Sequence, residues 1–304
     1  MKAFLSAARP LGRVVAGFGL ALTLAVGTTA LTAGAAHAQS VGSGSLSFNG
    51  DPGDYISQGQ QHDYSTSAKD RLTVYSNEDR SAVSVSVNGY QGNWWSLDLA
   101  APTGEQLHTG TYTGATRAPF KGAGPGLEIS GDGRGCNTLT GSFTVSNLVF
   151  GPHGYLQTLD ASYEQHCEGG AEALRGEVHI TNPVAPAELN LGLGIAVQGT
   201  ASSLNGKATV HGTVTCNKPV QVAVAGLVTQ VKNRVLIRGA YSTSVSCTPG
   251  APVAWSAAAD PTGTTPFQRG KVEVTAQATT TDPDYGVNVT ASQTTAVDLS
   301  KTGK

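Results

Sequence analysis

Short runs in which apolar and polar residues alternate recur along the chain from about residue 45 onward. Examples are RLTVYS at 71–76 and AVSVSVNG at 82–89, and KATVHGTVTC at 207–216 in the second half. Because successive side chains of a strand point to opposite faces, this alternation predicts half-buried β-strands. Beyond the N-terminal segment, no stretch of helical length shows the helical period. We therefore expect an all-β protein.

The segment TNPVAPAELNLG, residues 181–192, divides the predicted strands into two groups and contains two prolines close together. We expect it to join a domain at residues 39–183 to a domain at residues 184–304. The strands of the first domain predict a β-sandwich of jelly-roll-like character. About seven strands in the second domain predict an immunoglobulin-like β-sandwich.

The first residues have the three parts of a secretory signal peptide. Three basic residues precede an apolar run at 14–26, and the triplet AHA at 36–38 offers a cleavage site after Ala38. The apolar run is shorter than the roughly 20 residues that a membrane-spanning helix needs. We therefore expect residues 1–38 to be a cleaved signal peptide, and the mature protein to be secreted without a transmembrane segment.

Charge is distributed unevenly between the two predicted domains. Residues 39–183 carry 7 Lys and Arg against 15 Asp and Glu, whereas residues 184–304 carry 9 against 6. An acidic first domain argues against a nucleic-acid partner, which needs a basic surface. The small positive balance of the second domain is ordinary surface charge.

Motifs for catalysis and for cofactors are missing from the sequence. It contains no GxSxG, SxxK or HExxH, and the glycine-rich segment at 121–135 lacks the features of a phosphate-binding loop. We predict no catalytic residue and no cofactor, and the scattered histidines predict no metal site. The turn NGDPGD leaves one alternative open, because Asn49, Asp51 and Asp54 could bind calcium or could form an Asx-rich turn without a metal.

Four cysteines divide evenly between the two predicted domains. Cys136 and Cys167 are separated by 31 positions, and so are Cys216 and Cys247. An even number of cysteines in an exported protein favours disulfides. One bridge per domain is the pairing that keeps each bridge inside a compact unit, so we predict Cys136–Cys167 and Cys216–Cys247.

The segment LDASYEQHC, residues 159–167, shows how the alternation orients a reactive-looking pair. Its apolar residues share a face with Cys167, so Cys167 points to the core and His166 points outward. Neighbouring strand residues on opposite faces cannot easily form a thiol–imidazole pair. We therefore favour a structural disulfide over a Cys–His nucleophile.

A second strand follows at ALRGEVHI and predicts a charged hairpin. Its outward residues include Arg175 and His179, and one register places Glu164 opposite Arg175 and Asp160 opposite His179. We take these four residues as a candidate ligand-binding cluster. A solvated ladder of ion pairs is the alternative interpretation.

Trp94 and Trp95 in NWWSLDLAAP are neighbours on a predicted strand, so their side chains point to opposite faces. Trp95 shares a face with Leu97 and Leu99, which predicts a core position. Trp94 shares the other face with Ser96, which makes it a candidate platform for stacking against a sugar ring. It could instead lie beneath a loop or at a domain interface.

Several segments of the first half resemble a module of secreted bacterial proteins of uncharacterised function. They are GRGCNTLTG at 133–141, YEQHCEG at 163–169 and ALRGEV at 173–178. The second half resembles small secreted sandwich domains, through GTVTC at 212–216 and a Cys-to-Trp segment at 247–255. The resemblance implies surface or secreted proteins with immunoglobulin-like domains, and it implies no catalytic residues.

These features lead us to expect a non-enzymatic secreted or cell-envelope protein that binds carbohydrate, such as cell-wall or extracellular polysaccharide, or another surface component. A secreted polysaccharide hydrolase with an acidic cleft in the first domain is the alternative, and a structural spacer is a third possibility. A groove bearing Trp94 would favour binding, and two buried carboxylates facing one cleft would favour the hydrolase. The sequence specifies neither the ligand nor the oligomeric state.

Overall fold

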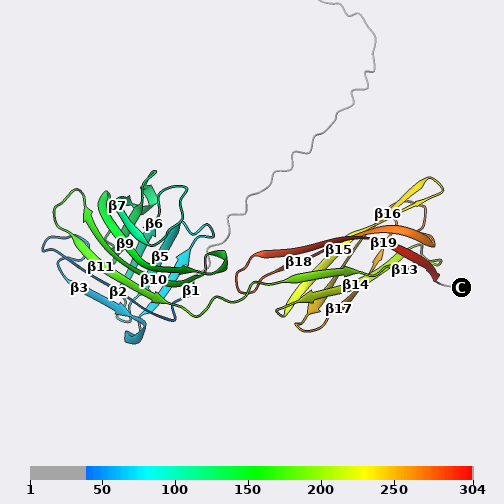
Figure 1. Cartoon of the computed structure of the whole chain (residues 1–304), viewed down its shortest axis with the longest axis horizontal. Helices are drawn as coiled ribbons and strands as arrows, with labels where there is room; N and C mark the ends of the chain where they lie inside the picture. The colour runs from blue at the N-terminus through cyan, green and yellow to red at the C-terminus, as the bar shows by residue number, and fades with distance from the viewer. Residues whose placement is uncertain (1–38, 303–304) are drawn as a thin grey trace, which may run out of the picture. The chain divides into compact units, whose positions relative to one another are not determined.

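A computed structural model describes residues 39–302, which form two β-sheets and no α-helix (Figure 1). The predicted signal peptide lies outside these described residues. Within them, no helix is long and apolar enough to cross a membrane. Three short 3₁₀ turns occur at Thr66–Ala68, Ala118–Phe120 and Pro152–Gly154.

The first sheet contains eleven strands in the order β1-β4-β5-β6-β8-β7-β9-β10-β11-β2-β3. All its pairs are antiparallel except β7 with β8. The strands are β1 Gln39–Ser40, β2 Ser43–Gly50, β3 Gln61–Ser65, β4 Arg71–Ser76, β5 Ala82–Asn88, β6 Trp94–Ala100, β7 Gly110–Arg117, β8 Gly126–Gly131, β9 Leu139–Phe150, β10 Leu156–Cys167 and β11 Leu174–Thr181.

This sheet curls around a single core, so strands that are far apart in its order meet inside it. Phe48 of β2 packs edge-on against Trp95 of β6, with ring centroids 4.7 Å apart. The Trp95 indole Nε1–H donates to the Tyr64 hydroxyl of β3 at 2.7 Å. Gln165 is fully buried and its side chain bonds both backbone groups of Ile129. These contacts close the apolar side of the sheet and leave the opposite side to face outward.

The second sheet contains eight strands. Seven follow the order β12-β14-β13-β19-β18-β15-β16, and the eighth, β17, pairs with β14 outside this order. β13 runs parallel to β19, whereas the other pairs are antiparallel. The strands are β12 Leu191–Ile195, β13 Gln198–Ser202, β14 Ala208–Cys216, β15 Val220–Lys232, β16 Val235–Cys247, β17 Val253–Ala259, β18 Gly270–Thr281 and β19 Asn288–Thr302.

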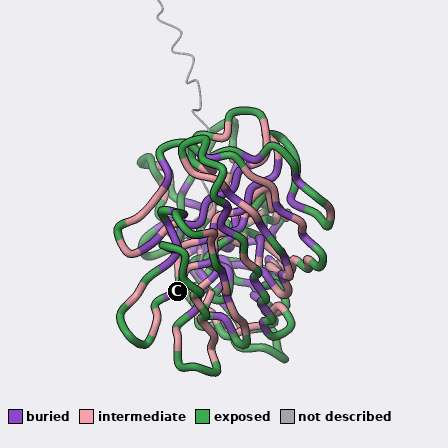
Figure 2. Tube along the Cα trace, turned by 90° about the vertical axis from the view of Figure 1, so that its left-hand side faces the viewer, coloured by how far each residue is buried: buried purple, intermediate pink, exposed green. Residues whose placement is uncertain are grey.

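Each sheet has its own hydrophobic core, and buried and exposed positions alternate along most strands (Figure 2). Trp95 is 0% exposed, as its strand face predicted, and Trp255 of the second core is 2% exposed. The two disulfides are Cys136–Cys167 in the first core and Cys216–Cys247 in the second, which confirms the predicted pairing.

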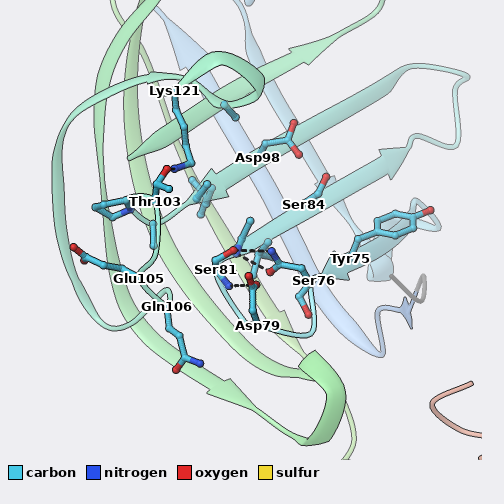
Figure 3. A pocket seen from close by; sticks show the side chains of 18 of the residues that line it. Tyr75, Ser76, Asp79, Ser81, Ser84, Asp98, Thr103, Glu105, Gln106 and Lys121 are labelled. Atoms are coloured by element: carbon cyan, nitrogen blue, oxygen red, sulfur yellow. Dashed lines mark hydrogen bonds between the residues drawn. The ribbon is translucent and has the colours of Figure 1, made fainter. Parts of the chain in front are cut away.

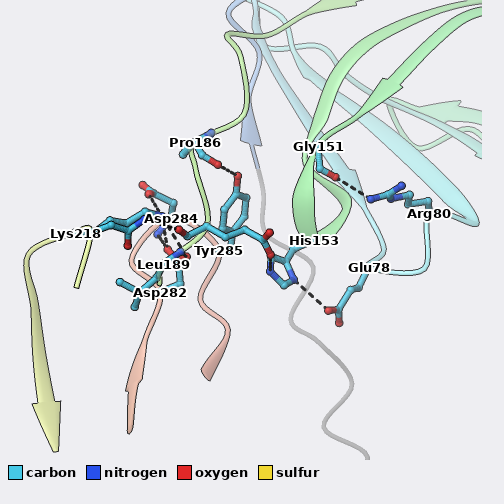
Figure 4. Close-up of polar contacts among 12 residues, drawn as sticks. Glu78, Arg80, Gly151, His153, Pro186, Leu189, Lys218, Asp282, Asp284 and Tyr285 are labelled. Atoms are coloured by element: carbon cyan, nitrogen blue, oxygen red, sulfur yellow. Dashed lines mark hydrogen bonds and ion pairs between the residues drawn. The ribbon is translucent and has the colours of Figure 1, made fainter. Parts of the chain in front are cut away.

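A buried carboxylate anchors the segment that precedes the second sheet (Figure 4). Asp282 accepts a backbone hydrogen bond from Leu189 at 2.6 Å and an ion pair from Lys218 at 2.9 Å. Burial opposes ionisation of Asp282, but its hydrogen bonds from the Asp284 backbone and Lys218 outweigh it and lower the pKa of this carboxyl. Tyr285 adds a hydrogen bond to the carbonyl of Pro186.

The alternating patterns located most strands, and four were missed. These are β1, β3, β12 and β13, which are two to five residues long. Short strands offer too few positions for an alternating pattern to stand out. The strand-free segment between the two sheets is residues 182–190, because β12 begins at Leu191, inside the segment that the prolines marked.

Candidate ligand-binding faces

The outward side of β4, β5, β6 and β8 forms a polar surface that we call the serine face. The register of these strands arranges eleven outward residues in three rows, and Asp132, just beyond the end of β8, completes the first row. The rows are Arg71, Asn88, Trp94 and Asp132; then Thr73, Ser86, Ser96 and Ser130; then Tyr75, Ser84, Asp98 and Glu128.

Trp94 stands at one end of the serine face and is 49% exposed. Its position is fixed by Asp132, whose carboxylate accepts from the Trp94 backbone N–H at 2.9 Å and from Asn93 Nδ2 at 2.8 Å. Asp132 lies just beyond β8 in the left-handed backbone region, with φ of 46°. The structure therefore agrees with the predicted outward position of Trp94, and a tight turn of the neighbouring strand holds its backbone.

A cavity of about 790 Å³ opens at the other end of the serine face, around Asp98 (Figure 3). Its floor includes Tyr75, Ser84 and Asp98. Its walls are three connecting segments, which carry small apolar residues beside polar ones. The apolar wall residues are Ala101, Pro102, Ala118 and Pro119.

The walls of this cavity are held by specific hydrogen bonds. The backbone N–H of Leu107 donates to the Arg80 carbonyl at 2.8 Å, and the Leu107 side chain is buried. The Lys121 ammonium donates to the Gly124 carbonyl at 3.0 Å and to Thr103 Oγ1 at 3.1 Å. The backbone N–H of Thr103 also donates to the carbonyl of Ala123 at 3.0 Å. These bonds join the walls to one another, so the cavity is largely formed before any ligand enters.

Asp98 and Glu128 face each other across β6 and β8 but have different surroundings. Glu128 is 4% exposed, and its Oε1 accepts from Arg117 Nε at 2.9 Å. No Lys, Arg or His lies within ion-pair distance of Asp98 among residues 39–302. Burial raises the pKa of Asp98, the charge on Glu128 raises it further, and hydrogen bonds from Ser84 and Ser96 oppose the shift.

The predicted charged hairpin lies elsewhere on the same curled sheet, on a surface that we call the ladder face. This face is the outward side of β10 and β11, and the register confirms both predicted pairs. Arg175 Nε donates to Glu164 Oε2 at 2.7 Å, and His179 Nδ1 lies 2.8 Å from Asp160 Oδ1. A shallow cavity of about 400 Å³ lies over Glu164 and Arg175, and its lining includes short polar side chains of β2, β9 and β10.

Charges on the ladder face are paired with one another. A hydrogen bond with His166 is the main cause that lowers the pKa of Glu164, and Arg175 lowers it further. Hydrogen bonding to Glu164 raises the pKa of Arg175. The outward position predicted for His166 is confirmed, although its side chain is partly covered and lies 3.3 Å from Glu164.

In the turn considered for calcium, the carboxylates of Asp51 and Asp54 form hydrogen bonds and an ion pair with other groups of the protein. Asp54 is buried and accepts from the backbone and the hydroxyl of Ser57. Asp51 accepts from the Ala173 backbone at 3.0 Å and pairs with Arg175 at 3.3 Å. Asn49 belongs to β2. Within residues 39–302, no group of three or more His, Cys, Asp or Glu converges as a metal site.

Sequence reasoning identified Trp94 and the ladder face but missed the cavity around Asp98. The signal for Asp98 was present, because it shares an outward face with Trp94 on β6. Its partner Glu128 is 30 positions away and could not be placed opposite it without the strand order. Neither a protein-family model nor a curated protein matches this chain.

Proposed function

We propose that this protein is a non-enzymatic, secreted or cell-envelope protein that binds carbohydrate along the serine face. The observation that carries the proposal is a formed cavity and an exposed Trp94 on one face of the same strand. The proposal also includes an immunoglobulin-like arrangement of the second sheet, a jelly-roll-like first sheet, and export directed by the N-terminal signal.

The serine face has the chemistry that a sugar chain requires. Sugar rings present hydroxyls at their edges and apolar C–H groups on their faces. The four serines of the face can bond hydroxyls, and Ala82 and Pro102 in the cavity can contact C–H groups. Binding sites of this kind are concave, partly apolar and set with a few polar groups.

The length of the face suits an extended ligand. Trp94 and Asp98 are four positions apart on β6, a separation of about 13 Å at strand geometry. Only Ser96 lies between them on that side of β6, and Ser86 and Ser130 flank it. A chain of several sugar units could therefore stack on Trp94 and end in the cavity without meeting a bulky side chain.

Binding of the purified protein to a glycan array, followed by pull-down on insoluble polysaccharides, tests the proposal. We expect wild-type protein to be retained and Trp94→Ala to be retained less. Ser96→Trp should block the middle of the face and abolish retention. Tyr55→Ala removes another exposed aromatic, in the loop between β2 and β3, and should bind as wild type does. Absence of wild-type binding to every saccharide would refute the proposal, and equal binding by Ser96→Trp would place the site on another surface.

A second candidate function is polysaccharide hydrolysis, and the Asp98–Glu128 pair favours it. Glycosidases use two carboxyl groups with different environments, one of which donates a proton. Against this function, Glu128 is almost fully buried under Arg117, so Asp98 is the only one of the two that lines the cavity. Release of new reducing ends from a bound polysaccharide would support the hydrolase, and loss of that release in Asp98→Asn would assign it to this pair.

A further inference from the structure

The cavity of the serine face carries an excess of negative charge. Its lining includes Asp79, Asp98 and Glu105 but only one cation, Lys121. The Lys121 ammonium already donates to two oxygens of the cavity wall. It is therefore held away from Asp98 by bonds that also shape the cavity.

Asp98 is the partly buried carboxylate of this cavity, and no ion pair within residues 39–302 compensates its charge. Its neighbours across the strands are Ser84 on β5 and Glu128 on β8, which supply a hydroxyl and a second negative charge. The one nearby guanidinium, that of Arg117, is bound to Glu128. A partly buried carboxylate beside another carboxylate is costly unless a cation pairs with it. A ligand that brings a positive charge would remove that cost.

We propose that the serine-face cavity selects saccharides that carry a free, protonated amine, with Asp98 as the carboxylate that pairs with the ammonium group. The inference rests on the proposed carbohydrate function and names the sugar class. An ammonium group would bond the Asp98 carboxylate directly, beside the hydroxyls of Ser84 and Ser96, which hydrogen-bond that carboxylate.

Charge also disfavours acidic sugars, and neutral sugars lack the cation that Asp98 would pair with. Acidic sugars would be repelled by Asp79, Asp98 and Glu105 together, and residues 39–183 are acidic as a whole. Neutral or N-acetylated sugars could use the serines and Trp94 but would leave Asp98 without a cation. The cavity therefore discriminates at the amine and not at the hydroxyls, which all these sugars share.

Isothermal titration calorimetry with two oligosaccharides of equal length tests this inference. One is a glucosamine oligomer and the other is the same oligomer fully N-acetylated, both in a buffer in which the free amines are protonated and Asp98 is ionised. A charge-assisted hydrogen bond predicts that the glucosamine oligomer binds at least about tenfold more tightly. Asp98→Asn should remove this preference. Asp63→Asn, the same change at an exposed position of β3, should keep it.

The possible outcomes distinguish a failure of amine selection from a failure of carbohydrate binding. Equal affinity of wild type for the two oligomers, or an Asp98→Asn variant that keeps the preference, would overturn amine selection while carbohydrate binding stands. Loss of the preference in both variants would also overturn it, because general charge attraction would then explain the difference. If wild type binds neither oligomer but retains another saccharide of the array, amine selection is wrong and the proposed function remains.

Discussion

The serine face and the ladder face are two outward surfaces of one curled sheet, and they treat charge in opposite ways. On the ladder face, Glu164 pairs with Arg175 and Asp160 with His179, in the open and over a shallow surface. On the serine face, Asp98 lies in a formed cavity and has no cation of its own among the described residues. The ladder face has the denser cluster of charges, but its charges neutralise one another, whereas the single carboxylate of Asp98 is left without a cation.

The two arrangements of charge contribute differently to the free energy of folding. Exposed ion pairs contribute little free energy of folding, about 0–1 kcal/mol each, and they leave no charge for a partner to satisfy. A carboxylate kept without a cation in a cavity costs free energy in the folded protein and leaves an unmet interaction. Uncompensated charge in a concave site is therefore the stronger sign of a ligand.

The largest expected effect separates the two tryptophans at the edge of the serine face. Trp95→Ala should lower the free energy of unfolding by about 3–5 kcal/mol, because it empties a fully buried site. Trp94→Ala should stay within about 0.5 kcal/mol of wild type, because the indole is half exposed. Chemical denaturation of both variants measures the difference. A large loss in Trp94→Ala would mean that Trp94 supports the fold and is not free to bind.

Next in size is the difference between Cys167 and His166 at the end of the ladder face. Cys167→Ala breaks the Cys136–Cys167 bridge and should cost about 2–5 kcal/mol. His166→Ala removes an outward, partly covered side chain and should cost about 0.5 kcal/mol or less. Thermal melts compare them. Similar large losses for both would show that the two faces of β10 are not energetically distinct.

Asp98→Asn should stabilise the protein at neutral pH, because it removes a partly buried charge that no cation compensates. Because burial raises the pKa of Asp98 in the folded state, its ionisation costs stability above that pKa, and the cost disappears below the ordinary carboxyl pKa. The stability of wild type should therefore approach that of Asp98→Asn as the pH falls through this window. Urea midpoints measured across the acidic range check this, and a variant less stable than wild type at neutral pH would contradict it.

The smallest effect is expected on the ladder face. Glu164→Gln should lower stability at neutral pH by about 0.5 kcal/mol, since the pair with Arg175 is largely exposed. The folded-state pKa of Glu164 is lowered, so its contribution is present above the ordinary carboxyl pKa and is lost as the pH falls through the lowered one. Urea midpoints at neutral and acidic pH measure it. Asp98→Asn and Glu164→Gln should thus shift stability in opposite directions, and shifts of the same sign would remove the contrast between the faces.

Much of each face could be predicted from the sequence, because alternation is a local property. The opposite orientations of Trp94 and Trp95 follow from two neighbouring positions on one strand. The pairs of the ladder face follow from a short hairpin, which links register to a few loop residues.

The cavity could not be predicted because it depends on contacts that are distant in sequence. Placing Asp98 opposite Glu128 requires β8 to lie beside β6, although β7 separates them along the chain. The Arg117 side chain that compensates Glu128 belongs to β7, the strand on the far side of β8 from β6. The walls come from connecting segments, whose course a strand pattern does not specify.

The parallel pairing of β13 with β19 determines how the second sheet would respond to tension along the chain. β13 is near the start of the second sheet and β19 is its last strand, and their backbones are hydrogen-bonded side by side from Gln198 to Ser202. Tension applied at the two ends of this region would pull the parallel strands in opposite directions along their axes. Their hydrogen bonds would then be loaded together in shear and would have to break as a group, whereas strands pulled apart from one end unzip one bond at a time. Under such tension, the β13–β19 pair should resist separation more than a pair that is loaded from one end.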